Sequence, residues 1–177
     1  MPGHDAARVV PDGDGWRLTG VAAFRSGSGP AALGYEVACG PDWATRAGVV
    51  RGFVGRAEVD WRIVREGRQW TFNGRAVPGL GHCVDLDFGF TPATNFTQTR
   101  RIALAVGEAA RVPVAWIDAD TAALVEAAQL TELQQTYVRR SEAACWYESS
   151  TTGYRALLEF APDGFVRLYP ELWEAEA

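Results

Sequence analysis

The sequence predicts a mainly β protein, built as an antiparallel, strongly curved sheet or a partly open β-barrel with at most one or two short helices. Turn dipeptides recur at short intervals along the chain, and the segments between them are short and alternate apolar with polar residues. Aromatic residues make up 11% of the chain and there are 19 Gly, a composition that favours strands and turns. The turn signals include Asp12-Gly13, Glu66-Gly67, Asn73-Gly74 and Asp163-Gly164.

Individual segments support this fold class. Val59, Trp61 and Ile63 alternate with charged residues, which is typical of a strand with one buried face. The segments 154–160 and 165–169 flank Pro162-Asp163-Gly164, and this arrangement predicts a hairpin. The stretch 120–135 is rich in Ala, Leu, Glu and Gln, and it predicts one short helix.

The length of 177 residues predicts a single domain over residues 1–177, with residues 1–12 and 174–177 frayed. No secretory signal and no apolar run of about 18 residues is found, so no membrane span is expected. The net charge of −5 argues against nucleic-acid binding. Cys39, Cys83 and Cys145 have no zinc-type spacing, so we expect reduced, buried thiols in a cytoplasmic protein, with no cofactor and no metal.

The most informative stretch runs from His82 to Leu104. Asp85 and Asp87 share one face of a strand pattern and would lie roughly 6.5–7 Å apart. A turn-rich segment from Thr91 to Asn95 follows, and we expect these two residues to bond the loop backbone. The pair Arg100-Arg101 comes next, at a distance suited to the return strand of a hairpin.

Three interpretations of these charges remain open. One arginine neutralises the carboxylates as a structural pair, or the carboxylates anchor a ligand, or they act as an acid/base pair. The strand spacing falls near the separation used by inverting glycosidases, but the sequence supplies no His, Lys or Tyr partner. His82 beside Cys83 is not expected to form a nucleophile–base pair, because adjacent residues on a strand point to opposite faces.

Six short motifs follow one another along the chain: Gly81–Asp87, Gly89–Asn95, Arg100–Ile102, Gln135–Tyr137, Asp163–Val166 and Tyr169–Trp173. In their order and spacing they resemble the signature of a bacterial family described as "putative glycolipid-binding". The length between Asn95 and Arg100 is kept, but 96–99 reads Phe-Thr-Gln-Thr where the family has Thr-Leu-Pro-Ile. The resemblance implies a fold similar to proteins that carry lipoproteins and lipids between bacterial membranes, with an apolar cavity. It also implies a strand, not a helix, in the second half of 120–135.

We therefore expect non-enzymatic binding of a lipid or glycolipid in an apolar, aromatic-lined cavity with a polar Asp/Arg anchor. The alternatives are a hydrolase acting on a glycosidic or amphipathic substrate through Asp85 and Asp87, and a protein in which the motif only fixes the fold. The aromatic residues could equally fill the core of a barrel. The expected ligand-binding residues are Asp85, Asp87, Thr91, Asn95, Arg100, Arg101, Trp61, Trp70, Trp116, Tyr137 and Tyr169.

Overall fold

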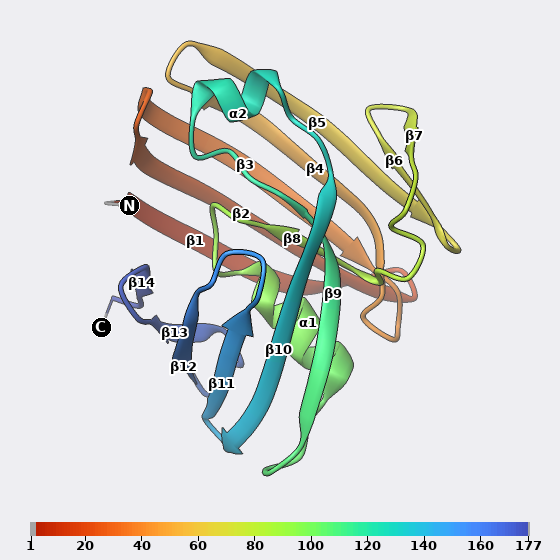
Figure 1. Cartoon of the computed structure of the whole chain (residues 1–177), viewed down its shortest axis with the longest axis vertical. Helices are drawn as coiled ribbons and strands as arrows, with labels where there is room; N and C mark the ends of the chain where they lie inside the picture. Colours follow the sequence, from red (N-terminus) through yellow and green to blue (C-terminus); the bar gives the residue numbers. More distant parts are fainter. Residues whose placement is uncertain (1–2, 177) are drawn as a thin grey trace.

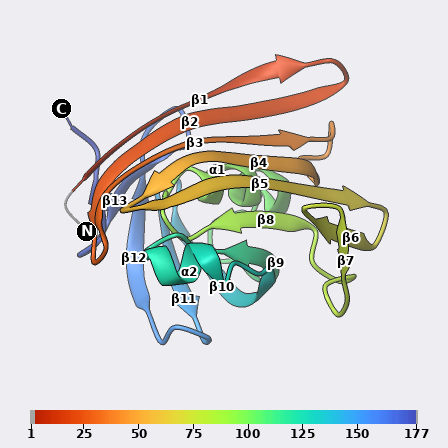
Figure 2. The same ribbon diagram turned by 90° about the horizontal axis from the view of Figure 1, so that it is seen from above.

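The computed structural model describes residues 3–176 and contains two seven-stranded sheets. The N-terminal sheet follows chain order, and each neighbouring pair of its strands is antiparallel. This sheet arches over the rest of the molecule (Figure 2). Its strands are β1 (Gly3–Asp12), β2 (Gly15–Ser26), β3 (Gly29–Cys39), β4 (Thr45–Val54), β5 (Ala57–Glu66), β6 (Gln69–Phe72) and β7 (Arg75–Val77).

The C-terminal sheet also follows chain order, from β8 at one edge to β14 at the other. The prediction of a mainly β, curved-sheet protein is confirmed, with one exception: β8 pairs with β9 in parallel. The helix α1 makes the crossover between these two strands and lies between the sheets (Figures 1 and 2). The elements are β8 (Asp85–Phe88), α1 (Thr94–Ile102), β9 (Ala109–Ile117), α2 (Ala122–Glu126), β10 (Thr131–Ser141), β11 (Ala144–Ser149), β12 (Arg155–Phe160), β13 (Val166–Tyr169) and β14 (Trp173–Glu174).

Local sequence patterns explain most of the strands. In β5, buried and exposed residues alternate from Ala57 to Ile63 as the sequence predicts. Asn73 and Gly74 have φ angles of 47° and 77°, the left-handed values that a tight turn between β6 and β7 requires. The predicted hairpin around Pro162-Asp163-Gly164 is confirmed as the β12–β13 pair.

Two local predictions differ from the structure. Residues 3–12 were expected to be frayed, but they form β1 and pair with β2 along the whole strand. The predicted helix over 120–135 is reduced to α2, because β10 begins at Thr131, in the half where the family resemblance implies a strand. Pairing with β9 and β11 gives those residues backbone partners and overrides their helix propensity. Residues 1, 2 and 177 lie outside the described part of the chain.

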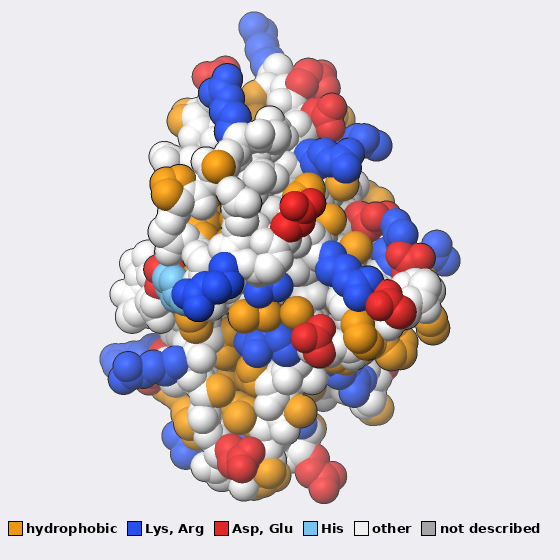
Figure 3. All heavy atoms as spheres, turned by 90° about the vertical axis from the view of Figure 1, so that its right-hand side faces the viewer, with side chains coloured by type: hydrophobic (Ala, Val, Ile, Leu, Met, Phe, Trp, Pro, Cys, Tyr) orange, Lys and Arg blue, Asp and Glu red, His pale blue; other side chains and the backbone are white. Residues whose placement is uncertain are grey.

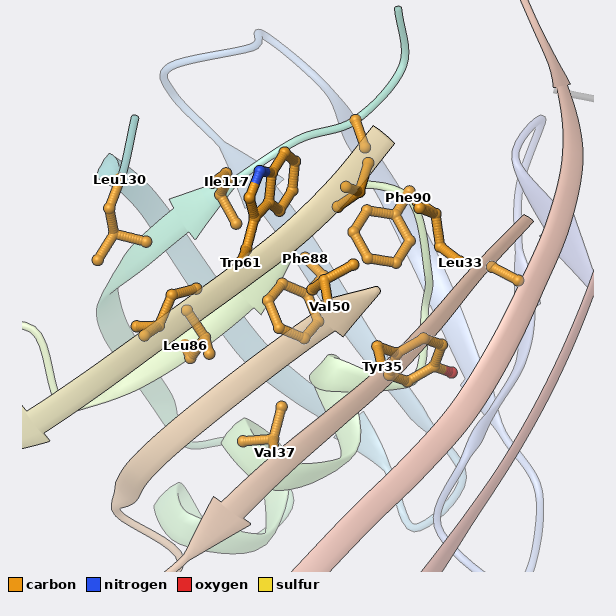
Figure 4. Close-up of a cluster of buried hydrophobic side chains, with 14 of the residues drawn as sticks. Leu33, Tyr35, Val37, Val50, Trp61, Leu86, Phe88, Phe90, Ile117 and Leu130 are labelled. Atoms are coloured by element: carbon orange, nitrogen blue, oxygen red, sulfur yellow. The ribbon is translucent and has the colours of Figure 1, made fainter. Parts of the chain in front are cut away.

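A packed apolar core fills the space between the N-terminal sheet and one face of β8. Leu86 and Phe88 enter among Leu33, Val50 and Trp61 (Figure 4). Leu86 and Phe88 are both 0% exposed. The interior on this side is therefore filled by side chains.

A second apolar cluster lies on the opposite face of the C-terminal sheet, where α1 packs. It includes Val112, Val114, Leu133, Tyr137 and Leu158, all of them buried. Since β8 is the edge strand between these two clusters, all four of its residues are buried. Two of those four residues are carboxylates, so the fold has to satisfy charge in its interior.

The surface has no large region of one charge on the face shown in Figure 3, where arginine and acidic side chains are interspersed among hydrophobic ones. The three cysteines are free and buried, as predicted. Among residues 3–176, neither helix has the length and apolar character needed to cross a bilayer.

We predict that Gly48→Ala destabilises the protein by about 1–3 kcal/mol, as overpacked cores do. A Cβ at this position would lie 2.2 Å from Leu86 Cδ2, and Leu86 is fully enclosed. Gly34→Ala on the neighbouring strand is the control, because its nearest contact would be 3.7 Å away. Urea denaturation measures both variants, and we expect the control to stay within about 0.5 kcal/mol of the parent. Equal effects would contradict this packing of β8 against β4.

Candidate functional site

The two carboxylates of β8 point toward α1, away from the apolar core. Helix α1 runs back along the strand and presents Thr94, Gln98 and Arg101 to it, at the i, i+4, i+7 spacing of one helix face. Thr94 reaches Asp87 and Arg101 reaches Asp85. The arginine partner therefore comes from a helix, whereas the sequence predicted a return strand.

The predicted Asp–Arg pair is confirmed between Asp85 and Arg101. The guanidinium donates through Nε at 2.8 and 3.0 Å and through a terminal nitrogen at 2.6 Å, a bidentate geometry. The Asp85 side chain is 0% exposed and that of Arg101 is 25% exposed. Burial raises the pKa of Asp85 and Arg101 opposes that shift, while Asp85 raises the pKa of Arg101. The guanidinium stays charged at neutral pH and favours the ionised form of Asp85, so the two side chains form an ion pair.

Asp87 sits in a network of neutral donors. Thr94 Oγ1 donates to one carboxylate oxygen at 2.5 Å, and Gln135 Nε2 donates to the other at 2.8 Å. Burial raises the pKa of Asp87 to about 6, although the hydrogen bonds from Thr94 and Gln135 and the nearby Gln98 amide oppose the shift. This carboxyl group therefore titrates much closer to neutrality than an exposed aspartate does.

Tyr137 extends this network below the helix. Its hydroxyl donates to Gln98 Oε1 at 2.8 Å and accepts from Asn95 Nδ2 at 2.6 Å. The Gln98 amide acts electrostatically on Asp87, but its Nε2 is buried without a hydrogen bond of normal geometry to any described residue. A donor is thus left free beside the Asp87 carboxylate.

A separate polar cluster ties the loop before α1 to the N-terminal sheet. Asp5 accepts from the Tyr35 hydroxyl at 2.8 Å and from Thr91 Oγ1 at 2.9 Å. The same Thr91 oxygen accepts from the Ala93 backbone N–H at 3.0 Å, so the predicted bond to the loop backbone is present for Thr91. The same prediction for Asn95 was wrong, because the Asn95 amide donates to the Tyr137 hydroxyl. This cluster makes β1 part of the surroundings of the site.

An inner pocket of about 290 Å³ opens on the α1 side of the C-terminal sheet. Asp87 and Asn95 form part of its polar lining, and six aromatic residues from five strands and one loop contribute to its walls. Burial also raises the pKa of Asp118 in this lining. The lining residues are Asp87, Phe88, Gly89, Thr91, Pro92, Asn95, Trp116, Asp118, Leu133, Tyr147, Ser149, Thr152, Tyr154, Tyr169, Leu172 and Trp173.

A second cavity, the edge pocket, has a volume of about 630 Å³ and lies between the edge strands β1 and β13–β14. Pro92 and Trp173 line both pockets, so the two spaces adjoin. Apolar members of the edge-pocket lining include Ala7, Val21 and Phe165. Val21 is 55% exposed, a high value for a large aliphatic side chain.

The expected ligand-binding residues fall into two groups. Five of them line the inner pocket: Asp87, Thr91, Asn95, Trp116 and Tyr169. The others lie elsewhere: Asp85 and Arg101 in their ion pair, Tyr137 buried behind Asp87, Trp61 and Trp70 in the filled core, and Arg100 at the surface. Arg100 donates to the backbone oxygen of Asp163, so its partner is not a carboxylate of β8.

Sequence reasoning missed several residues of the pocket. Tyr147 and Tyr154 form part of the aromatic wall, and Asp118 and Ser149 add polar groups. Tyr147 and Ser149 alternate on β11, so their shared face was readable once that strand was assigned. The helical spacing of Thr94, Gln98 and Arg101 was a further available signal.

Comparisons with known proteins agree with this architecture. The model of the family described as "Putative glycolipid-binding" matches residues 1–175. The chain belongs to this family. A DUF1089 family protein from Pseudomonas aeruginosa, known from a crystal structure, superposes with a TM-score of 0.84 at 25% identity, covering 99% of this chain and 93% of that one. A comparison with curated proteins found no match.

We predict that Arg101→Gln costs on the order of 3–5 kcal/mol, because it leaves the buried Asp85 carboxylate without its counter-charge. The adjacent Arg100→Gln is the matched control and should cost less than about 1 kcal/mol, since Arg100 is exposed. Guanidinium chloride denaturation compares the two variants. Similar losses for both would mean that Asp85 is not held by Arg101.

We also predict a pH dependence from Asp87. Its pKa is about 6 in the folded chain against an ordinary 3.8, so the folded state binds this proton more tightly than the unfolded state. The contribution of Asp87 to the free energy of unfolding is therefore complete below about pH 4 and declines as the pH rises through 6. Asp87→Asn imitates the protonated form and lacks this decline.

The measurement is urea denaturation of the parent and Asp87→Asn at several pH values between 4 and 7. The free energy of unfolding of the parent should fall relative to that of the variant by up to about 3 kcal/mol. A difference that stays constant across this range would show that Asp87 ionises normally.

Proposed function

We propose that this protein is a non-enzymatic binder of a lipid or glycolipid, with a hydroxyl-bearing head group held in the inner pocket. The observation that carries the proposal is the composition of this pocket, which combines carboxylate and amide groups with aromatic walls. Ligand sites are typically apolar with a few well-placed polar groups. The family description points to the same ligand class.

The chemistry of the pocket suits a sugar. Trp116, Tyr147 and Tyr154 offer flat apolar faces with polar edges, on which a sugar ring can stack. Asp87 and Asn95 supply hydrogen-bonding groups at one side of the pocket. Both are fixed in advance by their bonds to Thr94, Gln135 and Tyr137, so a ligand need not order them.

The apolar part of the ligand would lie in the edge pocket. This space adjoins the inner pocket at Pro92 and Trp173 and has about twice its volume. Val21 in the lining of the edge pocket is 55% exposed, and Leu172 in the lining of the inner pocket is 43% exposed. An acyl chain would cover apolar surface of this kind.

The geometry gives no support to the hydrolase alternative. A carboxylate pair of the glycosidase type requires both groups at the substrate, with one able to donate a proton. Asp87 lines the inner pocket, but Asp85 lies outside the lining and is engaged by Arg101. A nearby guanidinium favours the ionised carboxylate and so opposes a role as a general acid.

Binding of alkyl glycosides tests this proposal. We expect octyl glucoside, below the concentration at which it forms micelles, to change the tryptophan fluorescence saturably. Methyl glucoside and octanoate should bind more weakly, because each fills one pocket alone. Trp116→Leu should weaken octyl glucoside binding roughly three- to tenfold through loss of ring stacking.

The control variant is Trp146→Leu, since Trp146 lies on β11 outside both pocket linings and its indole N–H donates to Glu148 at 2.7 Å. Its affinity should match that of the parent chain. Absence of binding by all three compounds, or equal losses in the two tryptophan variants, would refute the assignment of the inner pocket.

A further inference from the structure

Three side chains of metal-binding type converge at the start of β8, on the side of the C-terminal sheet opposite α1. They are His82, Cys83 and Glu132, and their ligand atoms all lie within 4.8 Å of one another. His82 Nε2 and Glu132 Oε2 are 3.0 Å apart. The three residues have no metal-type spacing in the sequence, because Glu132 lies on β10, far along the chain from the other two residues.

The expectation that His82 and Cys83 point to opposite faces does not apply here. That expectation requires a strand, but β8 begins at Asp85 and His82 lies in a turn before it. The turn lets both side chains reach toward Glu132.

Cys83 and Glu132 are each held in place by contacts with residues outside this group of three. The Cys83 backbone donates to the Leu80 oxygen at 2.9 Å, and its own oxygen accepts from Trp70 Nε1 at 3.1 Å. Glu132 is fixed by the pairing of β10 with β9, and Gln134 donates to its Oε1. The other oxygen of Glu132, Oε2, is the one that faces His82.

We propose that His82, Cys83 and Glu132 form a zinc-binding site, with the imidazole nitrogen, the thiolate sulfur and a carboxylate oxygen as ligands. Zinc accepts this mixture of donors, whereas magnesium and calcium prefer oxygen alone. Three protein ligands leave one tetrahedral position for water or an outside ligand. Gln134 would orient the carboxylate, as outer groups commonly do at metal sites.

Binding requires a change of protonation at the cysteine. Burial, together with Glu132 and Asp85, raises the pKa of the Cys83 thiol to about 12, while Arg65 opposes the shift. The metal therefore displaces the thiol proton to solvent as the Zn–S bond forms.

The site would join two segments that are remote in sequence. Its ligands come from the turn before β8 and from β10, and β9 lies between these two strands in the sheet. A bound metal would thus clamp the edge strand that carries Asp85 and Asp87. This role is independent of the lipid-binding proposal, because none of the three ligands lines the inner or the edge pocket.

Cobalt titration tests the site on the full chain, freed of any purification tag. Co²⁺ should produce a thiolate-to-metal charge-transfer band and the visible absorption of a tetrahedral ion, and stoichiometric Zn²⁺ should abolish both. Zn²⁺ should also raise the melting temperature, since a ligand that binds the folded state stabilises it.

Cys83→Ser should lose the charge-transfer band, while Cys145→Ser, which alters a buried thiol elsewhere, should keep it. His82→Ala changes an exposed side chain, so it should fold normally and bind the metal at least tenfold more weakly. Failure of the parent to develop the charge-transfer band, or full retention of binding in His82→Ala, would overturn the proposal.

Discussion

The ion pair between Asp85 and Arg101 is the interaction on which the rest of the interior depends. An edge strand enclosed on both faces offers a carboxylate no water, so its charge requires a partner within the protein. Arg101 fills that need from the last turn of α1. The pair thereby fixes how far along β8 the helix lies.

The position of α1 in turn sets the remaining polar contacts. With Arg101 at Asp85, the first turn of the helix places Thr94 at Asp87 and Asn95 at the Tyr137 hydroxyl. These groups then form one side of the inner pocket, or lie directly behind it. A structural ion pair and a candidate ligand site therefore share one helix, and the ion pair positions the site although neither of its residues lines the inner pocket.

The sequence predicted the strands well because their signals are local. Alternation in β5 and the turn at Asn73-Gly74 depend on neighbouring residues alone. Helix α1 was not predicted, because its sequence contains several Thr and Asn residues, which have low helix propensity. The helix is stabilised by contacts with β8 and β10. The prediction that one of the two arginines pairs with a carboxylate of β8 was therefore correct, but the secondary structure predicted for that arginine was wrong.

The aromatic residues show the same limit. Trp70 and Trp116 are the same residue type on strands, yet one is enclosed in the core and the other lines the pocket. What distinguishes them is the stacking of the two sheets, which depends on residues far apart in the chain. Periodicity can assign a face to each residue, but it cannot say what covers that face.

The parallel pairing of β8 with β9 has a consequence for the order in which the chain folds. Each strand of the N-terminal sheet pairs with its sequence neighbour, so this sheet can grow by closing one short turn at a time. Strand β8 cannot pair with β9 through a short turn, because the whole of α1 lies between the two strands in the chain. Pairing of β8 with β9 therefore requires the closure of a longer loop, with higher entropic cost, than any pairing within the N-terminal sheet.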